Sequence, residues 1–345
     1  MSQPIKVGLL TNADGAHVSA YLQALAAAEA CSRVVLGDPD GRWENAARRA
    51  LGEKLIGVYR NHQELLSAES PELALVTLEA GLAPPVIQRS LDANCHVFAE
   101  KPACLSARDF EQLARHADSK HRHLMLALAN RSNSEILAAR ELIHSGKLGK
   151  IYGLEMHLVA DQTRLTRPDY HRQWFAQRSR SGGGHLIWLG IHWLDLAMFL
   201  TDATISSVCG FTANVGGQPI DIEDSAAATL QFSNGTLGTL TSGYYLDKGY
   251  HTHIKIWGAA GWLRIQTVAE PRLQWVTNTG ADAGQLQSWK PAQRVSGYTP
   301  FVASAIKACS ENTTPPISNF DSLRALKTVF GIYESAQTGR AIQVA

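Results

Sequence analysis

The chain has 345 residues, more than one hydrophobic core usually supports, because cores stop growing near roughly 250–300 residues. Two domains are therefore expected. Hydrophobic residues make up 45% and charged residues 18%, a balance that excludes a disordered or fibrous chain. The 32 Lys plus Arg nearly balance the 31 Asp plus Glu, so the formal charge is +1. This excludes an overall positive potential that would attract nucleic acid or an anionic membrane. A small, weakly charged ligand is favoured.

The five cysteines are odd in number and show no CxxC spacing, so neither a disulfide framework nor a metal site is predicted. They are typical of thiols in a reducing cytoplasm. The amino terminus lacks the long apolar core of a signal peptide, and no uncharged apolar run approaches the roughly 18–20 residues of a membrane span. A cytoplasmic protein without a membrane partner is predicted.

The first third of the chain alternates short apolar runs with helix-like stretches. Strands are predicted at 5–10, 33–38, 55–59, 73–78, 96–102 and 123–129, and helices at 17–30, 44–52, 61–67, 84–94 and 106–120. This alternation is typical of βαβ units and a parallel sheet. The strands are continuous apolar runs, as expected when helices cover both faces of the sheet.

The second part opens with a helix at 134–146 and then becomes rich in strands, at 150–160, 205–215, 225–245, 253–267 and 272–278. Hairpin turns are predicted at Asn234-Gly235 and at 259–261. These features predict a large, mainly antiparallel sheet, a surface loop at 279–297 and a closing helix at 322–340. The domains are placed at 1–125 and 126–345. Two helices, 134–146 and 185–200, can cover only one face, so the other is predicted to be a dimer surface.

The first strand–turn–helix is the expected place for a dinucleotide, where main-chain amides approach the pyrophosphate. No GxGxxG is present, and Thr11 and Ala13 stand where glycines are expected. The candidate cofactor residues in this turn are Leu9, Leu10, Thr11, Asn12, Asp14 and Gly15. The alternative is an α/β domain that has lost its nucleotide.

Asp38 follows the second predicted strand, where a carboxylate accepts hydrogen bonds from the adenosine ribose. A carboxylate there repels a 2′-phosphate, so NAD is favoured over NADP, although Arg42 lies near enough to soften that preference. The alternative is a solvated turn residue.

Lys101 lies between a strand and Pro102, which keeps the lysine out of a helix and at the carboxyl end of a sheet strand. Open α/β sheets bind ligands at that edge, and Thr77, Leu78 and Glu100 are further cofactor candidates there. A partly desolvated ammonium beside a positive nicotinamide becomes a usable acid/base. The alternative is an exposed lysine paired with Glu100.

Three glycines at 182–184 permit a tight approach before a helix that is otherwise almost entirely apolar. His185, Trp188, His192 and Asp195 follow at spacings of three, four and three, which predicts one helical face. Buried polar groups on such a face need partners or a ligand. The alternatives are satisfied core histidines or a metal site, and the spacing lacks the usual i, i+4 histidine pair.

Taken together, these features resemble the Gfo/Idh/MocA family of oxidoreductases. The matching segments are AEKP at 99–102, Asn130-Arg131, 145–153, the GGG…LGIHWLD run at 182–195, Glu223-Asp224 before a strand, and 333–342. The resemblance implies an amino-terminal Rossmann-like parallel sheet followed by an α+β domain with a large, mainly antiparallel sheet. It also implies that Lys101 and His192 are catalytic and flank nicotinamide and substrate.

Two departures from the family pattern stand out. The glycine-rich turn is changed at Thr11 and Ala13, and Trp188 replaces the aspartate that usually precedes the active-site histidine by four residues. The predicted reaction is hydride transfer between NAD and a CH–OH group of a sugar, cyclitol or related polyol. Alternatives are a redox-neutral glycoside lyase or hydrolase with tightly bound NAD, and a non-catalytic sugar sensor.

The candidate substrate-binding residues combine the resemblance with the spacing of polar and aromatic side chains. They are Lys101, Arg131, Tyr170, Trp174, His185, Trp188 and His192. The expected partners are a sugar-like small molecule and further copies of the chain, in a homodimer or homotetramer.

Overall fold

The computed structural model describes residues 3–163, 165–246 and 248–344, which form two compact units. Unit 1 contains the residues up to Ser132 together with Ser179–Gly182 and Ser296–Leu323, and unit 2 contains the rest. The sequence predicts a second domain over 126–345, whereas unit 1 extends to Ser132 and also contains two later segments. No local sequence pattern links those segments to the first 132 residues.

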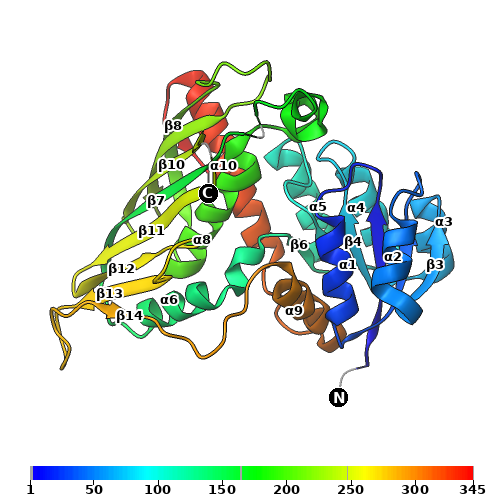
Figure 1. The fold of residues 1–345 in the computed structure, drawn as a ribbon, viewed down its shortest axis with the longest axis horizontal. Coiled ribbons are helices and arrows are strands. Elements are labelled where there is room, and N and C mark those ends of the chain that lie inside the picture. Colours follow the sequence, from blue (N-terminus) through cyan, green and yellow to red (C-terminus); the bar gives the residue numbers. More distant parts are fainter. Residues whose placement is uncertain (1–2, 164, 247, 345) are drawn as a thin grey trace. The chain divides into compact units, whose positions relative to one another are not determined.

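Unit 1 is built on a six-stranded parallel sheet with the order β3-β2-β1-β4-β5-β6. Helix α1 packs beside α2 and α9, and α4 packs beside α3 and α5, so helices occupy both faces of the sheet (Figure 1). The predicted parallel sheet is confirmed. The strands are β1 (Ile5–Thr11), β2 (Cys31–Gly37), β3 (Leu55–Tyr59), β4 (Leu73–Thr77), β5 (His96–Ala99) and β6 (Leu124–Leu126); the helices are α1 (Val18–Ala27), α2 (Glu44–Leu51), α3 (His62–Glu69), α4 (Ala83–Asp92), α5 (Ala107–Ser119) and α9 (Tyr298–Glu311).

Main-chain N–H groups of the edge strand β6 donate hydrogen bonds to side chains from a distant part of the chain. Asn319 Oδ1 accepts a hydrogen bond from the Leu124 N–H at 2.6 Å, and Ser322 Oγ accepts one from the Leu126 N–H at 3.1 Å. An open strand edge is a template for unwanted pairing, and these contacts block it.

Unit 2 is built on a nine-stranded sheet with the order β14-β13-β12-β11-β7-β10-β9-β8-β15. Its pairs are antiparallel except for β10 with β7, which run parallel. The mainly antiparallel sheet is confirmed, including the hairpin at Asn234-Gly235, where Gly235 has a φ of 85°. The strands are β7 (Ile151–Asp161), β8 (Ile205–Ala213), β9 (Ser225–Phe232), β10 (Leu237–Leu246), β11 (Tyr250–Gly258), β12 (Gly261–Ile265), β13 (Leu273–Thr277), β14 (Gln287–Ser288) and β15 (Ile342–Gln343).

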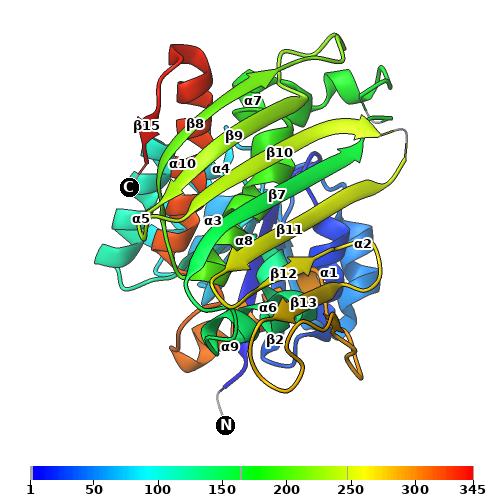
Figure 2. The ribbon, with the colours of Figure 1, turned by 90° about the vertical axis from the view of Figure 1, so that its left-hand side faces the viewer.

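Helices α6 (Ser134–His144) and α8 (Ile191–Thr201) lie against one face of this sheet. Figure 2 shows the opposite face towards the viewer, with no helix of unit 2 in front of it. Along β10, Leu240 and Ser242 are buried while Thr239 and Thr241 are exposed, which is the alternation of a sheet covered on one side. Two further helices are α7 (Arg178–Ser181) and α10 (Asn319–Thr338).

The segment Arg178–Thr201 is long and apolar enough, by composition alone, to cross a membrane. However, 78% of its most apolar window is buried inside the structure. That burial is typical of the core helix of a globular domain.

Candidate functional site

The turn after β1 lies against the end of β4. Thr11 Oγ1 donates to the Thr77 carbonyl at 3.2 Å, and Thr77 Oγ1 donates to the Ala16 carbonyl at 2.5 Å. A Cβ atom on Gly15 would collide with Thr11 Oγ1 and the Thr77 carbonyl, so only glycine fits there. Leu9, Leu10 and Leu78 are buried in the adjoining core. The predicted residues of β1 and β4 therefore meet at the carboxyl edge of the sheet.

The main-chain amides of this turn are engaged within the protein. The Ala13 N–H donates to Asp40 Oδ2 at 2.8 Å and the Asp14 N–H to Asn12 Oδ1 at 3.1 Å. The Gly15 N–H donates to the Asn12 carbonyl at 3.1 Å. A glycine-rich phosphate loop instead leaves such amides for the ligand.

Asp38 follows β2 and is fully buried, so it is not a solvated turn residue. Its Oδ2 accepts a hydrogen bond from the Trp43 N–H at 2.7 Å, whereas its Oδ1 has no partner among the described residues. A buried carboxylate oxygen without a donor is expected to meet a ligand hydroxyl. This oxygen fits the ribose of an adenine dinucleotide.

Glu100 and Lys101 follow β5 and are both buried, with 1% and 2% of their surfaces exposed. Lys101 is therefore not an exposed lysine. Glu100 Oε2 accepts a short hydrogen bond from the Tyr21 hydroxyl and lies 3.2 Å from His17 Nδ1. Burial is the largest single influence on the pKa of Glu100 and raises it, but the interactions with His17, Lys101 and the Tyr21 hydroxyl together outweigh burial and lower the pKa. The carboxylate thus stays charged, and its Oε1 has no partner among the described residues.

Two other members of this cluster, His17 and Tyr298, are not predicted from the sequence. The Tyr298 hydroxyl lies 3.2 Å from His17 Nδ1, and its ring contacts Tyr21 at 5.0 Å. His17 has a φ of 58°, a left-handed backbone that side chains other than glycine rarely adopt. Tyr298 lies about 280 residues from His17 in sequence, so no local pattern could have linked them.

In unit 2, the glycines at 183 and 184 are explained by close packing. A Cβ atom on Gly183 would collide with the Tyr333 hydroxyl, and one on Gly184 with the Glu223 carbonyl. The buried Glu223 carboxylate accepts hydrogen bonds from the Gly184 N–H at 2.8 Å and the Leu186 N–H at 3.0 Å. The Tyr333 hydroxyl donates to the same carboxylate at 2.7 Å.

Two more amides of this turn are satisfied, because the His185 N–H donates to the Glu223 carbonyl at 3.1 Å and the Ile187 N–H to the Tyr333 hydroxyl at 3.2 Å. Four consecutive amides at the start of the helix thus have partners. Burial raises the pKa of Glu223 despite these donors.

Leu186–Gly190 forms a π-helical turn before α8, so the segment from His185 to Asp195 is not the regular α-helix on which the prediction of one helical face is based. A π turn contains more residues per turn than an α-helix and so changes their angular spacing. His185 is fully buried, with Nδ1 2.6 Å from Ser242 Oγ on β10 and its ring edge-on to Tyr244 at 4.4 Å. His192 is half-buried near the start of α8.

An aromatic cluster surrounds Trp188, which is half-buried. Its ring lies 5.4 Å from the buried Trp174 ring and 5.6 Å from the half-buried Phe175 ring. Tyr170 is buried and lies 4.9 Å from Phe175. Tyr170 and Trp174 are thus placed in the core, where they support the more exposed Trp188 and Phe175.

Arg131, in unit 1, is held by an ion pair with Asp321 at 3.2 Å and is only 6% exposed. Within the described residues, no group of three or more His, Cys, Asp or Glu is arranged to hold a metal ion.

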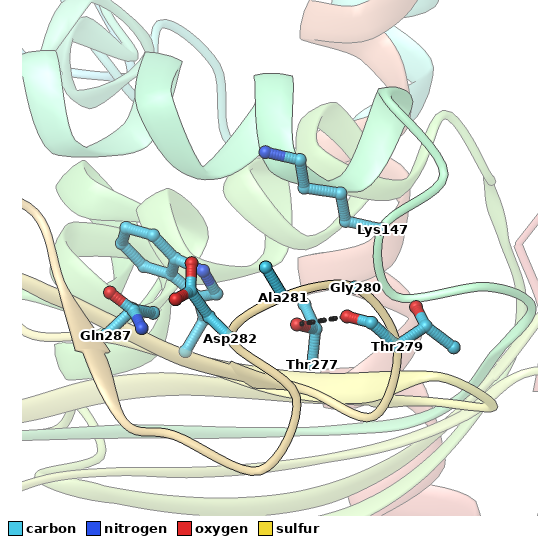
Figure 3. Close-up of a pocket in the computed structure, with 8 residues that line it drawn as sticks. Lys147, Thr277, Thr279, Gly280, Ala281, Asp282 and Gln287 are labelled. Atoms are coloured by element: carbon cyan, nitrogen blue, oxygen red, sulfur yellow. Dashed lines mark hydrogen bonds between the residues drawn. The ribbon is translucent and has the colours of Figure 1, made fainter.

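A separate hollow of about 350 Å³ opens beneath the loop between β13 and β14 (Figure 3). Lys147, Trp275, Asp282 and Gln287 contribute to its lining. None of the predicted site residues lines it.

Comparison with known proteins agrees with this architecture. Residues 11–128 match the family described as "Oxidoreductase family, NAD-binding Rossmann fold", and residues 136–264 match the GFO/IDH/MocA C-terminal domain. An uncharacterized oxidoreductase of Schizosaccharomyces pombe is 30% identical over 177 residues, which are 51% of this chain and 47% of that protein. The first curated relatives are thus matched over about half of their length.

D-glucoside 3-dehydrogenase of Escherichia coli is 26% identical over 270 residues, covering 71% of this chain and 72% of that protein. Among solved structures, levoglucosan dehydrogenase in complex with NADH and levoglucosan has the same fold, with a TM-score of 0.86, 19% identity and 99% coverage of both chains. The two family matches together span more than two thirds of the sequence and agree with the two folds observed. The chain therefore belongs to the Gfo/Idh/MocA family of NAD-binding oxidoreductases.

Proposed function

We propose that this protein is an NAD-dependent oxidoreductase that acts on a CH–OH group of a sugar, cyclitol or related polyol. The observation that carries the proposal is the buried Lys101 at the carboxyl end of β5, in a unit whose sequence belongs to an NAD-binding family. Burying an ammonium is costly, and buried charged groups at the ligand-binding edge of a parallel sheet are typical of functional sites.

When bound, NAD supplies the hydride acceptor or donor at its nicotinamide. In the oxidative direction the hydroxyl proton of the substrate must move to a protein base as the C–H bond is broken. We assign Lys101 as that acid/base, and we assign His192 as a second group that can hold the proton. Asp38 Oδ1 would accept the hydrogen bond of the adenosine ribose, and the turn from Leu9 to Gly15, with Thr77, Leu78 and Glu100, would contact the rest of the cofactor.

The proposed substrate is a glycosidic or otherwise bulky sugar. Trp188 offers a flat apolar surface that can stack on the C–H face of a sugar ring, and it cannot accept a proton or hold a charge. The name of the Escherichia coli relative, D-glucoside 3-dehydrogenase, supports a glycoside.

The proposal is tested by incubating the purified protein with NAD and a panel of free sugars, glycosides and cyclitols while NADH absorbance is followed. Reduction of NAD by a glycoside in preference to a simple polyol is expected. Native mass spectrometry separates the alternatives: NAD that co-purifies and does not exchange supports redox-neutral cleavage of a glycoside, and no affinity for NAD supports a sugar sensor.

The preference for NAD over NADP follows from the buried Asp38 carboxylate, which repels a 2′-phosphate. Calorimetry with both nucleotides measures it. Equal or tighter binding of NADP would contradict this assignment.

We further propose a homodimer or homotetramer in the cytoplasm, formed through the uncovered face of the unit 2 sheet. Phe211, Leu237 and Tyr245 project from strands of that face and are 73%, 62% and 45% exposed. Large apolar side chains on one face are typical of an interface.

A further inference from the structure

The turn after β1 carries negative charge where a diphosphate is expected. Asp14 lies within the turn, and the Asp40 carboxylate is bound to the Ala13 N–H. The amides of residues 13, 14 and 15 are already bonded to protein oxygens. A diphosphate at these three amides would have to displace those oxygens, so a separate donor that also offsets the aspartates is favoured.

Arg180 supplies a cation at this place. Its guanidinium makes a short ion pair with the Glu79 carboxylate, which lies just beyond β4, and Nη2 is 3.9 Å from Asp14 Oδ2. The Arg180 carbonyl also accepts a hydrogen bond from the Gly81 N–H at 3.3 Å. The segment Ser179–Gly182 belongs to unit 1, so these contacts lie within one unit.

The ion pairs of Arg180 with Glu79 and with Asp14 differ in burial and in length, so the looser partner can be exchanged while the other is kept. The Glu79 side chain is only 10% exposed and holds Arg180 closely, whereas the Asp14 side chain is 48% exposed and its contact is long. The Arg180 side chain is 35% exposed, and both of its ion pairs use Nη2. Glu79 thus anchors one corner of a partly exposed planar fork, a group that can bind phosphate oxygens in pairs.

We propose that Arg180 binds the diphosphate of the cofactor and replaces the main-chain amides of a glycine-rich loop in that task. Glu79 orients the guanidinium, and Asp14 occupies it loosely until the diphosphate displaces that carboxylate. The inference rests on the proposed NAD dependence. It explains how a turn with Thr11, Ala13 and Asp14 in place of a glycine pattern remains compatible with a dinucleotide.

The test compares Arg180→Gln and Arg180→Lys with the parent protein by calorimetry, using ADP-ribose, NAD and adenosine as ligands. For Arg180→Gln we expect ADP-ribose and NAD to bind roughly 10- to 100-fold more weakly, the range for losing a hydrogen bond to a charged group. Adenosine, which has no phosphate, should bind unchanged. Arg180→Lys retains the charge but loses the fork, so an intermediate loss is expected.

Arg115→Gln is the matched control, because Arg115 also pairs with one glutamate, Glu111, but on the exposed side of α5. It should leave all three affinities unchanged. Unchanged ADP-ribose binding in Arg180→Gln, or an equal loss for adenosine, would overturn the proposal. If Arg180→Gln melts too low for calorimetry, the dependence of ADP-ribose binding on salt in Arg180→Lys decides, because an unchanged affinity and salt slope also overturns it. A parent protein that binds adenosine and ADP-ribose but oxidises no sugar contradicts only the proposed function.

Discussion

At the scale of single residues, Lys101 combines burial with a position at the ligand-binding edge of the parallel sheet. Lys101→Met keeps the length of the side chain and removes the ammonium. Turnover should fall on the order of 10²–10⁴-fold, the range for a positioned acid/base, because the hydroxyl proton then lacks its acceptor. Steady-state kinetics and NAD titration measure the two effects. Collapse of NAD affinity with turnover per bound cofactor intact would mean that the lysine holds the cofactor instead.

Trp188 distinguishes this chain from the pattern of its family, and its ring is half-buried against Trp174 and Phe175. Trp188→Ala removes the proposed surface for the sugar. Affinity for a glycoside should fall by roughly 2- to 10-fold, since contact with an aromatic ring contributes about 0.5–1.5 kcal/mol beyond the area that it buries. NAD affinity should stay the same.

The melting temperature of Trp188→Ala separates this role from simple packing. Phe175→Ala serves as the control, since Phe175 is also half-buried in the same cluster. A large drop in melting temperature with unchanged glycoside affinity would assign Trp188 to the core.

Site residues could be identified from the sequence where their position depends on a local strand pattern, but not where it depends on partners far away in the sequence. Asp38, Glu100 and Lys101 follow strands, and the strand pattern alone predicted the edge at which they lie. Arg180 and Tyr298 are far in sequence from the residues of unit 1 that they contact. Their contacts depend on tertiary packing that no hydrophobic periodicity encodes.

At the scale of elements, the start of the segment that carries His192 depends on a carboxylate from a different part of the chain. Glu223→Gln leaves one acceptor oxygen in place of two, so either the Gly184 N–H at one position or the Leu186 N–H and the Tyr333 hydroxyl at the other face an NH2 group that cannot accept. Leaving a buried donor unsatisfied costs about 1–3 kcal/mol, so the melting temperature should fall. The pH profile of turnover should also change, because His192 loses its fixed position.

Two further variants test whether the changed pH profile is specific to the Glu223 carboxylate. Tyr333→Phe removes one donor to Glu223 and leaves the carboxylate, so we expect a smaller effect. Glu155→Gln changes a half-buried carboxylate on the outer face of the sheet and should leave the profile unaltered. If Glu223→Gln lowers stability but leaves the pH profile intact, Glu223 supports the fold without positioning His192.

Strand β5 begins at His96, which is buried and stacked on His123 at 4.7 Å. Burial, with His123 and Arg122 nearby, lowers the pKa of His96 to about 4. In an unfolded chain the pKa of histidine is about 6.5, so between these values the unfolded state binds more protons. Stability is therefore full above about pH 6.5 and is lost as pH falls towards about 4, by up to about 3 kcal/mol.

Thermal unfolding between neutral and acid pH checks this expectation. His96→Asn keeps an acceptor for the His123 N–H but cannot gain the proton, so its melting temperature should depend less on pH. His251→Asn, on the exposed end of β11, should retain the dependence of the parent protein. An identical pH dependence in His96→Asn would exclude His96 as its source.

The elements themselves were predictable where their hydrophobic period was clear. The six strands and five crossover helices of the first 126 residues repeat a βαβ pattern, and the Asn234-Gly235 turn predicted a hairpin. The π turn at Leu186–Gly190 was not predictable from the sequence. A segment that is apolar on nearly every side has no hydrophobic period, so an α-helix with 3.6 residues per turn cannot be distinguished from a wider helix.

At the scale of the whole molecule, the uncovered face of the unit 2 sheet predicts self-association. Phe211→Glu places a charge at a position that is 73% exposed in the single chain, so the fold should tolerate it while the proposed interface should not. Light scattering should show a dimer or tetramer for the parent protein and smaller species for the variant. Leu286→Glu, an exposed loop position that is 58% accessible, is the matched control. A dilute monomer in the parent protein would contradict the interface.

The packing of α9 against α1 also determines when unit 1 can be completed during synthesis. All six strands of its sheet leave the ribosome within the first 126 residues, but α9 begins at Tyr298. At about 5–20 residues per second, the roughly 170 residues between the end of β6 and the start of α9 take roughly ten to thirty seconds to synthesise. The nascent chain therefore carries the complete six-stranded sheet for about half of its translation while the side of α1 that packs against α9 is still uncovered.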